Sequence, residues 1–111
     1  MRRTSRALIF TFAAAATAFW SSSAASQSTD GASLYKERTC IACHGPDAKT
    51  PILPVYPRLA GQSAEYALQQ MKDIKSGARS NGNTAAMKGV MFLVNDEEMK
   101  ILADYLSSLT P

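Results

Sequence analysis

The alternation of apolar and polar positions predicts an amphipathic helix over residues 63–77. Apolar side chains return there at helical spacing, with glutamines and lysines between them, which is typical of a helix with one buried face. The apolar positions are Tyr66, Leu68, Met71 and Ile74. Ser63 is a suitable N-cap and Gly77 a suitable residue to end the helix, so local signals define both ends.

A second amphipathic pattern near the C-terminus predicts a helix that begins at Asn95. Asn95, followed three positions later by Glu98, has the form of a capping box. The apolar positions that follow recur three or four residues apart on one helical face. They are Met99, Leu102, Tyr105, Leu106 and Leu109. This is the clearest helix in the chain.

Weaker signals predict two shorter helices. Asp30 can cap a helix over residues 31–40, in which Arg38 lies near the C-terminal end, where a positive charge suits the helix dipole. Another helix can start at Thr84 and run to about residue 93. No segment has the alternation of a strand, and no repeat is present, so we expect an all-α fold.

The segment between the helix expected over residues 31–40 and the helix expected over residues 63–77 is rich in proline. Pro51, Pro54 and Pro57 fall at every third position, which excludes a helix and favours an extended path. A linker or a ligand for a peptide-binding domain would also be proline-rich. Apolar residues are interleaved with the prolines, which favours a strand-like loop pressed against an apolar surface. They are Ile52, Leu53, Val55, Tyr56 and Leu59.

The beginning of the chain has the features of an export signal. Three arginines lie within the first six positions, a largely apolar run follows over residues 7–20, and small residues come next. The run is shorter than the roughly 20 residues of a membrane span. We expect a signal peptide over residues 1–25, one domain over residues 26–111 and delivery to the periplasm; an uncleaved N-terminal anchor is the alternative.

Removal of the signal changes the charge balance. The whole chain has 12 Lys and Arg residues against 9 Asp and Glu residues, and three of the arginines lie in the signal. The domain is therefore balanced, and nothing in its charge favours nucleic-acid binding. Its size is marginal for a hydrophobic core alone, so a bound cofactor would help to stabilise it.

Cys40, Cys43 and His44 form a C-x-x-C-H motif that contains both cysteines and the only histidine of the chain. This is the spacing of c-type haem attachment, in which two thiols bond the haem edge and the imidazole binds iron. A thioredoxin-like site would need a βαβ pattern, structural zinc would need four ligands, and a disulfide would close a small, strained loop. The motif therefore predicts one covalently attached haem c.

A six-coordinate iron needs a second axial donor, and the chain has no second histidine. Methionine sulfur is the obvious candidate. The methionines after the motif are Met71, Met87, Met91 and Met99. Met71 and Met99 lie on helical stripes, where a packing role is usual. Met87 and Met91 are four residues apart, so that one can bind iron while the other packs.

These motifs together resemble the bacterial class I c-type cytochromes over residues 30–109. The resemblance rests on the Cys40–His44 motif, the Pro-Arg-Leu-Ala-Gly-Gln stretch at 57–62, and Met87 eight residues before the acidic start of the last helix. It implies a cytochrome c fold of four to five short helices around one haem. It also implies that His44 and Met87 are the two iron ligands.

The resemblance further implies contacts that support the site. The carbonyl of Pro57 would accept a hydrogen bond from His44 Nδ1, which would fix the imidazole ring. The first and last helices would cross at a contact between a small residue and an aromatic ring. The matching positions are Gly31 or Ala32, Tyr35, Leu102 and Tyr105. Tyr56, Arg58 and Arg79 are candidates for contact with the haem propionates, with a solvated surface role as the alternative for each arginine.

A closed, six-coordinate iron implies electron transfer without bond chemistry, so we expect a one-electron carrier and not an enzyme. Its partners would be redox proteins met in transient contacts, with no nucleic acid and no stable membrane insertion after signal cleavage. A haem-bearing electron-transfer subunit of a dehydrogenase complex would have the same site and is the alternative. A haem sensor with a vacant sixth position is a third possibility, which Met87 argues against.

Overall fold

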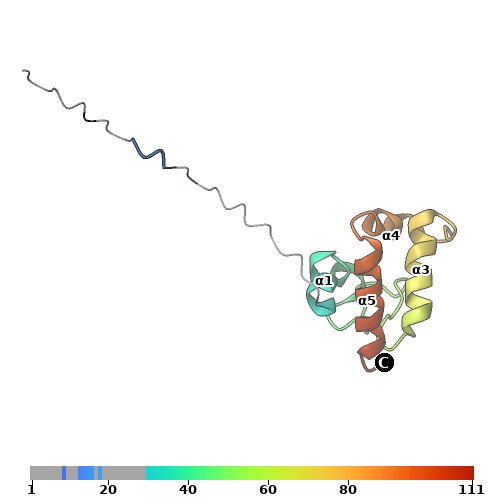
Figure 1. Ribbon diagram of the computed structural model, residues 1–111. Coiled ribbons are helices and arrows are strands. Elements are labelled where there is room, and N and C mark those ends of the chain that lie inside the picture. Colours follow the sequence, from blue (N-terminus) through green and yellow to red (C-terminus); the bar gives the residue numbers. More distant parts are fainter. Residues whose placement is uncertain (1–8, 10–12, 17, 19–29) are drawn as a thin grey trace, which may run out of the picture.

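The computed structural model describes Ile9, residues 13–16, residue 18 and residues 30–111. Within these residues the helices are α1 (Gly31–Glu37), α2 (Ile41–His44), α3 (Ala64–Ser76), α4 (Thr84–Met91) and α5 (Asp96–Ser108). The described part of the chain contains no strand, so the predicted all-α class is confirmed. In Figure 1, α5 runs through the middle of the domain, with α1 on one side and α3 on the other.

The predicted signal peptide, residues 1–25, and its boundary with residues 26–111 lie almost entirely outside the described residues, so both stay predictions. Among the helices that are described, none combines the length and the apolar character needed to cross a bilayer.

Helix α1 crosses α5 at a contact that leaves no room for a side chain on Gly31. A Cβ atom built there would lie 2.3 Å from Cβ of Tyr105 and 3.2 Å from the carbonyl oxygen of Ile101. One turn further along α1, the ring of Tyr35 packs against the ring of Tyr105 with centroids 5.9 Å apart. The predicted crossing of the first and last helices is therefore confirmed, with Gly31 at the closest approach.

Helix α3 packs against α5, and α4 packs against α3. The predicted caps are present: the Ser63 hydroxyl accepts a hydrogen bond from an α3 amide, Gly77 ends α3 with φ of 88°, and the Asn95 side chain caps α5. The largest fully buried side chains are Tyr35, Leu34, Met91, Met99, Leu102 and Val94. The core thus collects residues from all the helices except the short α2.

The first helix is shorter than predicted. A helix was expected over residues 31–40, but α1 ends at Glu37 and Arg38 closes it. Thr39 has φ of 64°, a left-handed conformation that an α-helix cannot continue through. The chain therefore changes direction just before the C-x-x-C-H motif, which forms a separate helix.

Helix α4 also ends before the predicted position near residue 93. The amides of Leu93 and Val94 bond to carbonyls three residues back, at Val90 and Met91, and this tighter turn replaces the α-helical pattern. The chain then needs only a short connection before α5 begins.

The proline-rich loop is tied into the domain at both ends. The carbonyl of Ala48 accepts a hydrogen bond of 2.8 Å from the amide of Leu59, and the amide of Gly61 donates one of 2.9 Å to the carbonyl of Leu106 in α5. These contacts are incompatible with a free linker. The expected strand-like path is replaced by turns, since prolines lack the amide that a strand ladder needs.

Candidate functional site

One short helical turn presents the residues of the C-x-x-C-H motif. Helix α2 starts directly after Cys40 and ends at His44. Cys40, Cys43 and His44 therefore follow at the i, i+3 and i+4 spacing that places side chains on one helical face. Both cysteines are half-buried free thiols, and His44 is buried. The fold thus brings the two attachment groups and the candidate iron ligand together.

The imidazole of His44 is oriented by the proline-rich loop. Its Nδ1 atom lies 2.9 Å from the carbonyl oxygen of Pro57, so the predicted hydrogen bond is present. Because a carbonyl only accepts hydrogen bonds, Nδ1 carries the proton and the lone pair of Nε2 is left for a metal ion. Burial lowers the pKa of His44, although the bond to Pro57 acts in the opposite direction. The ring is therefore neutral near pH 7, as an iron ligand must be.

Gly45, the residue after His44, accepts a hydrogen bond and has no room for a side chain. The buried hydroxyl of Tyr35 donates a hydrogen bond of 2.7 Å to the carbonyl of Gly45. Burial raises the pKa of Tyr35, so the hydroxyl keeps the proton that it donates. A Cβ on Gly45 would lie 2.1 Å from the carbonyl oxygen of Thr50. This second role of Tyr35 left no signal in the sequence, because its partner lies outside the periodic pattern of α1.

The two thiols do not have the setting of a redox-active pair. Burial raises the pKa of Cys40 to about 11, whereas reactive cysteines have lowered pKa values. Cys40 and Cys43 are not joined to each other. Within residues 30–111 and the few described before them, no three His, Cys, Asp or Glu side chains gather as a metal site. The arrangement favours thioether attachment over the thioredoxin-like, disulfide and zinc alternatives.

The four methionines of the domain differ in burial. Met71, Met91 and Met99 belong to the buried core, as predicted for Met71 and Met99. Met87 lies one turn before Met91 on α4 and is half-buried at the edge of that core. Met91, with 1% of its surface exposed, is occupied by packing. Met87 is therefore the more accessible residue of the two candidates.

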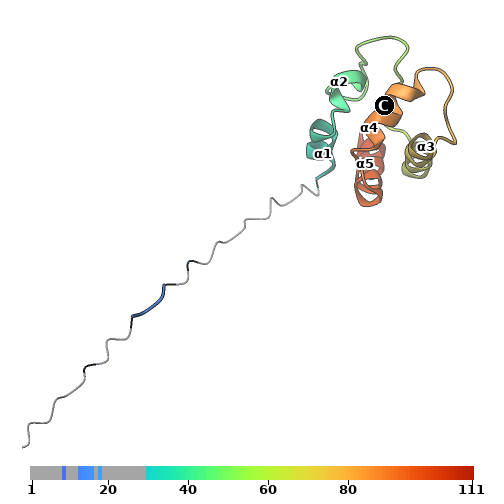
Figure 2. The same ribbon diagram turned by 90° about the horizontal axis from the view of Figure 1, so that it is seen from above.

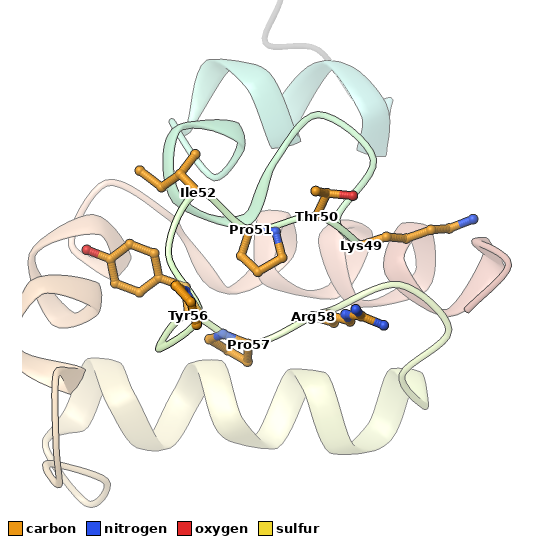
Figure 3. Close-up of a pocket in the computed structure, with 8 residues that line it drawn as sticks. Lys49, Thr50, Pro51, Ile52, Tyr56, Pro57 and Arg58 are labelled. Atoms are coloured by element: carbon orange, nitrogen blue, oxygen red, sulfur yellow. The ribbon is translucent and has the colours of Figure 1, made fainter.

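The proline-rich loop lines a cavity that includes Pro57, the hydrogen-bond partner of His44 (Figure 3). The lining residues are Lys49, Thr50, Pro51, Ile52, Pro54, Tyr56, Pro57 and Arg58. Figure 3 shows Ile52 and Tyr56 pointing to one side of the loop and Lys49 and Arg58 to the other. The apolar side chains of Ile52 and Val55 are 62% and 61% exposed. Two thiols, an oriented imidazole and exposed apolar side chains on the neighbouring loop fit a haem ring.

The three residues considered for the haem propionates have different surroundings. Tyr56 and Arg58 line the cavity. The guanidinium of Arg79 instead donates a hydrogen bond of 3.0 Å to Oε1 of Gln70 on α3. Tyr56 and Arg58 thus remain candidates, while Arg79 has a contact that holds the loop after α3.

A long-range ion pair was not predicted. Arg38 Nε and Nη2 donate hydrogen bonds of 2.8 Å and 2.6 Å to the two carboxylate oxygens of Glu98. Arg38 was expected to act on the dipole of its own helix, and Glu98 on the cap of its own helix. Their side chains instead join the end of α1 to the first turn of α5. The cap of α5 is made by the Asn95 side chain, which accepts a hydrogen bond of 2.8 Å from the Glu98 amide.

Helices α2 and α4 thus carry the two candidate ligands on separate parts of the fold, as Figure 2 shows from above. His44 comes from α2, before the proline-rich loop, and Met87 comes from α4, after α3. Ligands from two separate helices can enclose a planar group between them.

Comparison with known proteins identifies the family. Residues 28–110 match the sequence profile of the family described as Cytochrome c. The chain is 36% identical over 104 residues to cytochrome c-553 of Nitratidesulfovibrio vulgaris, a match that covers 94% of this chain and 98% of that protein. It is 41% identical over 70 residues to cytochrome c-554(548) of Halomonas halodenitrificans, covering 63% of this chain and 83% of that protein.

A solved structure agrees with these matches. The fold is similar to that of reduced recombinant cytochrome c4 from Pseudomonas stutzeri, with a TM-score of 0.64 and 30% sequence identity. This match covers 72% of the chain described here and 46% of the cytochrome c4 chain. The chain therefore belongs to the cytochrome c family, and it is an electron-transfer protein that carries covalently attached haem c.

Proposed function

We propose that the haem is attached through thioether bonds from Cys40 and Cys43, with His44 and Met87 as the axial ligands of its iron. The observation that carries this proposal is the single turn α2, which presents both thiols beside an imidazole that Pro57 already orients. Met87 is supported by its half-buried place on α4, whereas Met91 is part of the core.

Bound haem supplies a couple between ferric and ferrous iron that takes up and releases one electron. The residues of the chain set its properties. Pro57 fixes the ring of His44 and makes it a more basic ligand. A thioether sulfur from Met87 favours the reduced state and so raises the potential. With side chains in both axial positions, no position is open to a substrate, and the protein transfers electrons without making or breaking bonds.

We place the mature domain, residues 26–111, in the periplasm after removal of residues 1–25. The positively charged start and the short apolar run support export. There the protein exchanges single electrons with redox partner proteins through transient contacts, and it has no stable membrane insertion. As a subunit of a dehydrogenase complex it would keep the same site but would stay bound to a larger chain.

Extraction with acidified acetone tests the attachment. Haem held by two thioether bonds should stay with the protein, and Cys40→Ser with Cys43→Ser should release it. Haem that leaves the wild-type protein would contradict covalent attachment through these residues. Gel filtration of a periplasmic extract tests the carrier role: the chain should elute without a larger partner.

Met87→Ala tests the second ligand. Ferric haem with a bound thioether has a weak absorption band at the red end of the spectrum, and this band should disappear in Met87→Ala. The reduced variant should also bind carbon monoxide, because a position on the iron is open. Met91→Ala is the matched control and should keep the band. Loss of the band in Met91→Ala with its survival in Met87→Ala would assign the ligand to Met91.

A further inference from the structure

A partly buried ion pair connects the approach to α2 with the start of α5. Arg38 donates hydrogen bonds of 2.8 Å and 2.6 Å to the two carboxylate oxygens of Glu98. Only 5% of Glu98 is exposed, and Asn95 Nδ2 donates a third bond of 3.3 Å to the same carboxylate. Removing the charge of Arg38 would therefore leave the carboxylate of Glu98 poorly solvated and without its partner.

The pair links two segments that the site needs in register. Arg38 lies two residues before Cys40, in the segment that leads into α2. Glu98 lies in the first turn of α5, and only residues 92–95 separate α5 from α4, which carries Met87. The ion pair thus fastens the segment with the attachment thiols to the segment that follows Met87.

A second contact restrains the same connection from the side of α3. The ammonium group of Lys75 donates a hydrogen bond to the carbonyl of Val94, whose side chain is 1% exposed. The connection between α4 and α5 is therefore bonded to α3 at Val94 and to the carboxylate of the Arg38–Glu98 pair at Asn95. A shift of this connection relative to α3, or of the start of α5 relative to the end of α1, would strain one of these contacts.

We propose that Arg38 and Glu98 are positioning residues for Met87, because their ion pair keeps α4 at the distance from α2 at which the Met87 sulfur stays on the iron. This inference rests on the proposed ligation by Met87. The protein then has a closed form, with Met87 bound, and a minor open form, with Met87 displaced, and the pair favours the closed form.

Added imidazole measures the open form. Imidazole binds ferric iron only where Met87 has left it. Its apparent affinity is therefore proportional to the fraction of protein in the open form. Glu98→Gln keeps the shape of the side chain but removes its charge, and it should bind imidazole about tenfold more tightly than the wild type. Arg38→Lys keeps the charge but loses the bidentate contact with Glu98, so it should give a smaller increase in imidazole affinity. Each titration is monitored by the loss of the absorption band at the red end of the spectrum.

Two control variants separate positioning from general stability. Glu97→Gln removes an exposed carboxylate next to Glu98 and should leave the imidazole affinity unchanged. Leu109→Ala removes a half-buried side chain at the other end of α5, and should lower stability in urea with little effect on imidazole binding.

The positioning role is overturned if Glu98→Gln has the wild-type affinity. It is also overturned if Leu109→Ala raises the affinity as much as Glu98→Gln does at an equal loss of stability. A wild-type protein without the red-end band would instead show that Met87 is not a ligand, and both proposals would fall. The band in the wild type, together with tighter imidazole binding in Glu98→Gln than in either control, supports both.

Discussion

Gly45 follows the candidate iron ligand His44, and its backbone lies in a region that other residues almost never enter. Its φ of 83° and ψ of 164° are accessible to glycine and strained for any residue with a Cβ atom. The space around it is also closed, since a Cβ would lie 2.1 Å from the carbonyl oxygen of Thr50. The turn that leads the chain away from the imidazole therefore depends on one residue type.

Gly45→Ala should destabilise the haem-bound protein by about 2–4 kcal/mol, because the strained backbone and the steric clash add together. Urea unfolding followed by circular dichroism measures this change. Gly82→Ala is a matched control, since Gly82 also has a positive φ, 57°, but a Cβ there would meet nothing within 4 Å. It should cost only about 1 kcal/mol. Equal costs for the two variants would show that the Thr50 contact can relax.

At the same scale, the sequence predicts some site residues much better than others. Cys40, Cys43 and His44 are adjacent in the chain, so their grouping needs no knowledge of the fold. The bond from His44 to Pro57 was expected only from the family resemblance. The pairing of Arg38 with Glu98 spans 60 residues and could not be read from either helix, because each residue has a satisfactory local explanation.

At the scale of elements, the crossing of α1 and α5 is set by the missing side chain at Gly31. Gly31→Ala should destabilise the protein by about 1–3 kcal/mol, since a Cβ would lie 2.3 Å from Cβ of Tyr105 and the helices must separate. Thermal unfolding of the holoprotein measures the loss.

The same substitution at Gly89 should have the opposite effect. Gly89 lies inside α4 with nothing within 4 Å of a built Cβ, so alanine there should stabilise the protein by about 0.5–1 kcal/mol through its higher helix propensity. Stabilisation by both variants would mean that α1 and α5 are not in close contact.

The boundaries of these elements were predictable where a cap marks them. Ser63, Gly77 and Asn95 each fix a helix end by a bond within four residues, and all three ends lie where the sequence indicated. The end of α1 has no such mark. Thr39 is a β-branched residue that local preferences would not place at φ of 64°, so this end of the helix could not be predicted from the sequence.

At the scale of the whole molecule, hydrogen bonds to carboxylates determine how the protein responds to acid. A hydrogen bond from Ser33 lowers the pKa of Asp30, and hydrogen bonds from the amides of Lys49 and Thr50 lower the pKa of Asp47. The hydrogen bonds from Arg38 lower the pKa of Glu98 below its ordinary value of 4.5. Each group is therefore ionised more easily in the folded state than in the unfolded state.

The stability that these carboxylates contribute is fully present above their ordinary values and is lost as the pH falls through their lowered values in the folded protein. The urea midpoint should therefore fall below about pH 4.5. Because burial also lowers the pKa of His44 from its ordinary value of 6.5, the unfolded chain takes up a proton there first, and the midpoint should begin to decline below about pH 6.5. Glu98→Gln and Asp47→Asn should each flatten this acid limb. Lys72→Gln changes the net charge without removing a carboxylate and should keep the wild-type slope; an equal flattening there would assign the effect to overall charge.

The contact between Gly31 and Tyr105 also imposes an order in time. The chain is made from its N-terminus, so the thiols of Cys40 and Cys43 emerge while the α5 segment that packs against α1 does not yet exist. Until Tyr105 arrives, α1 has no partner on its buried face, and a helix of that length is not stable alone. The segment that carries the attachment motif therefore cannot reach its final packing before the last helix has been made. The last helix to be made is the one that closes the domain over it.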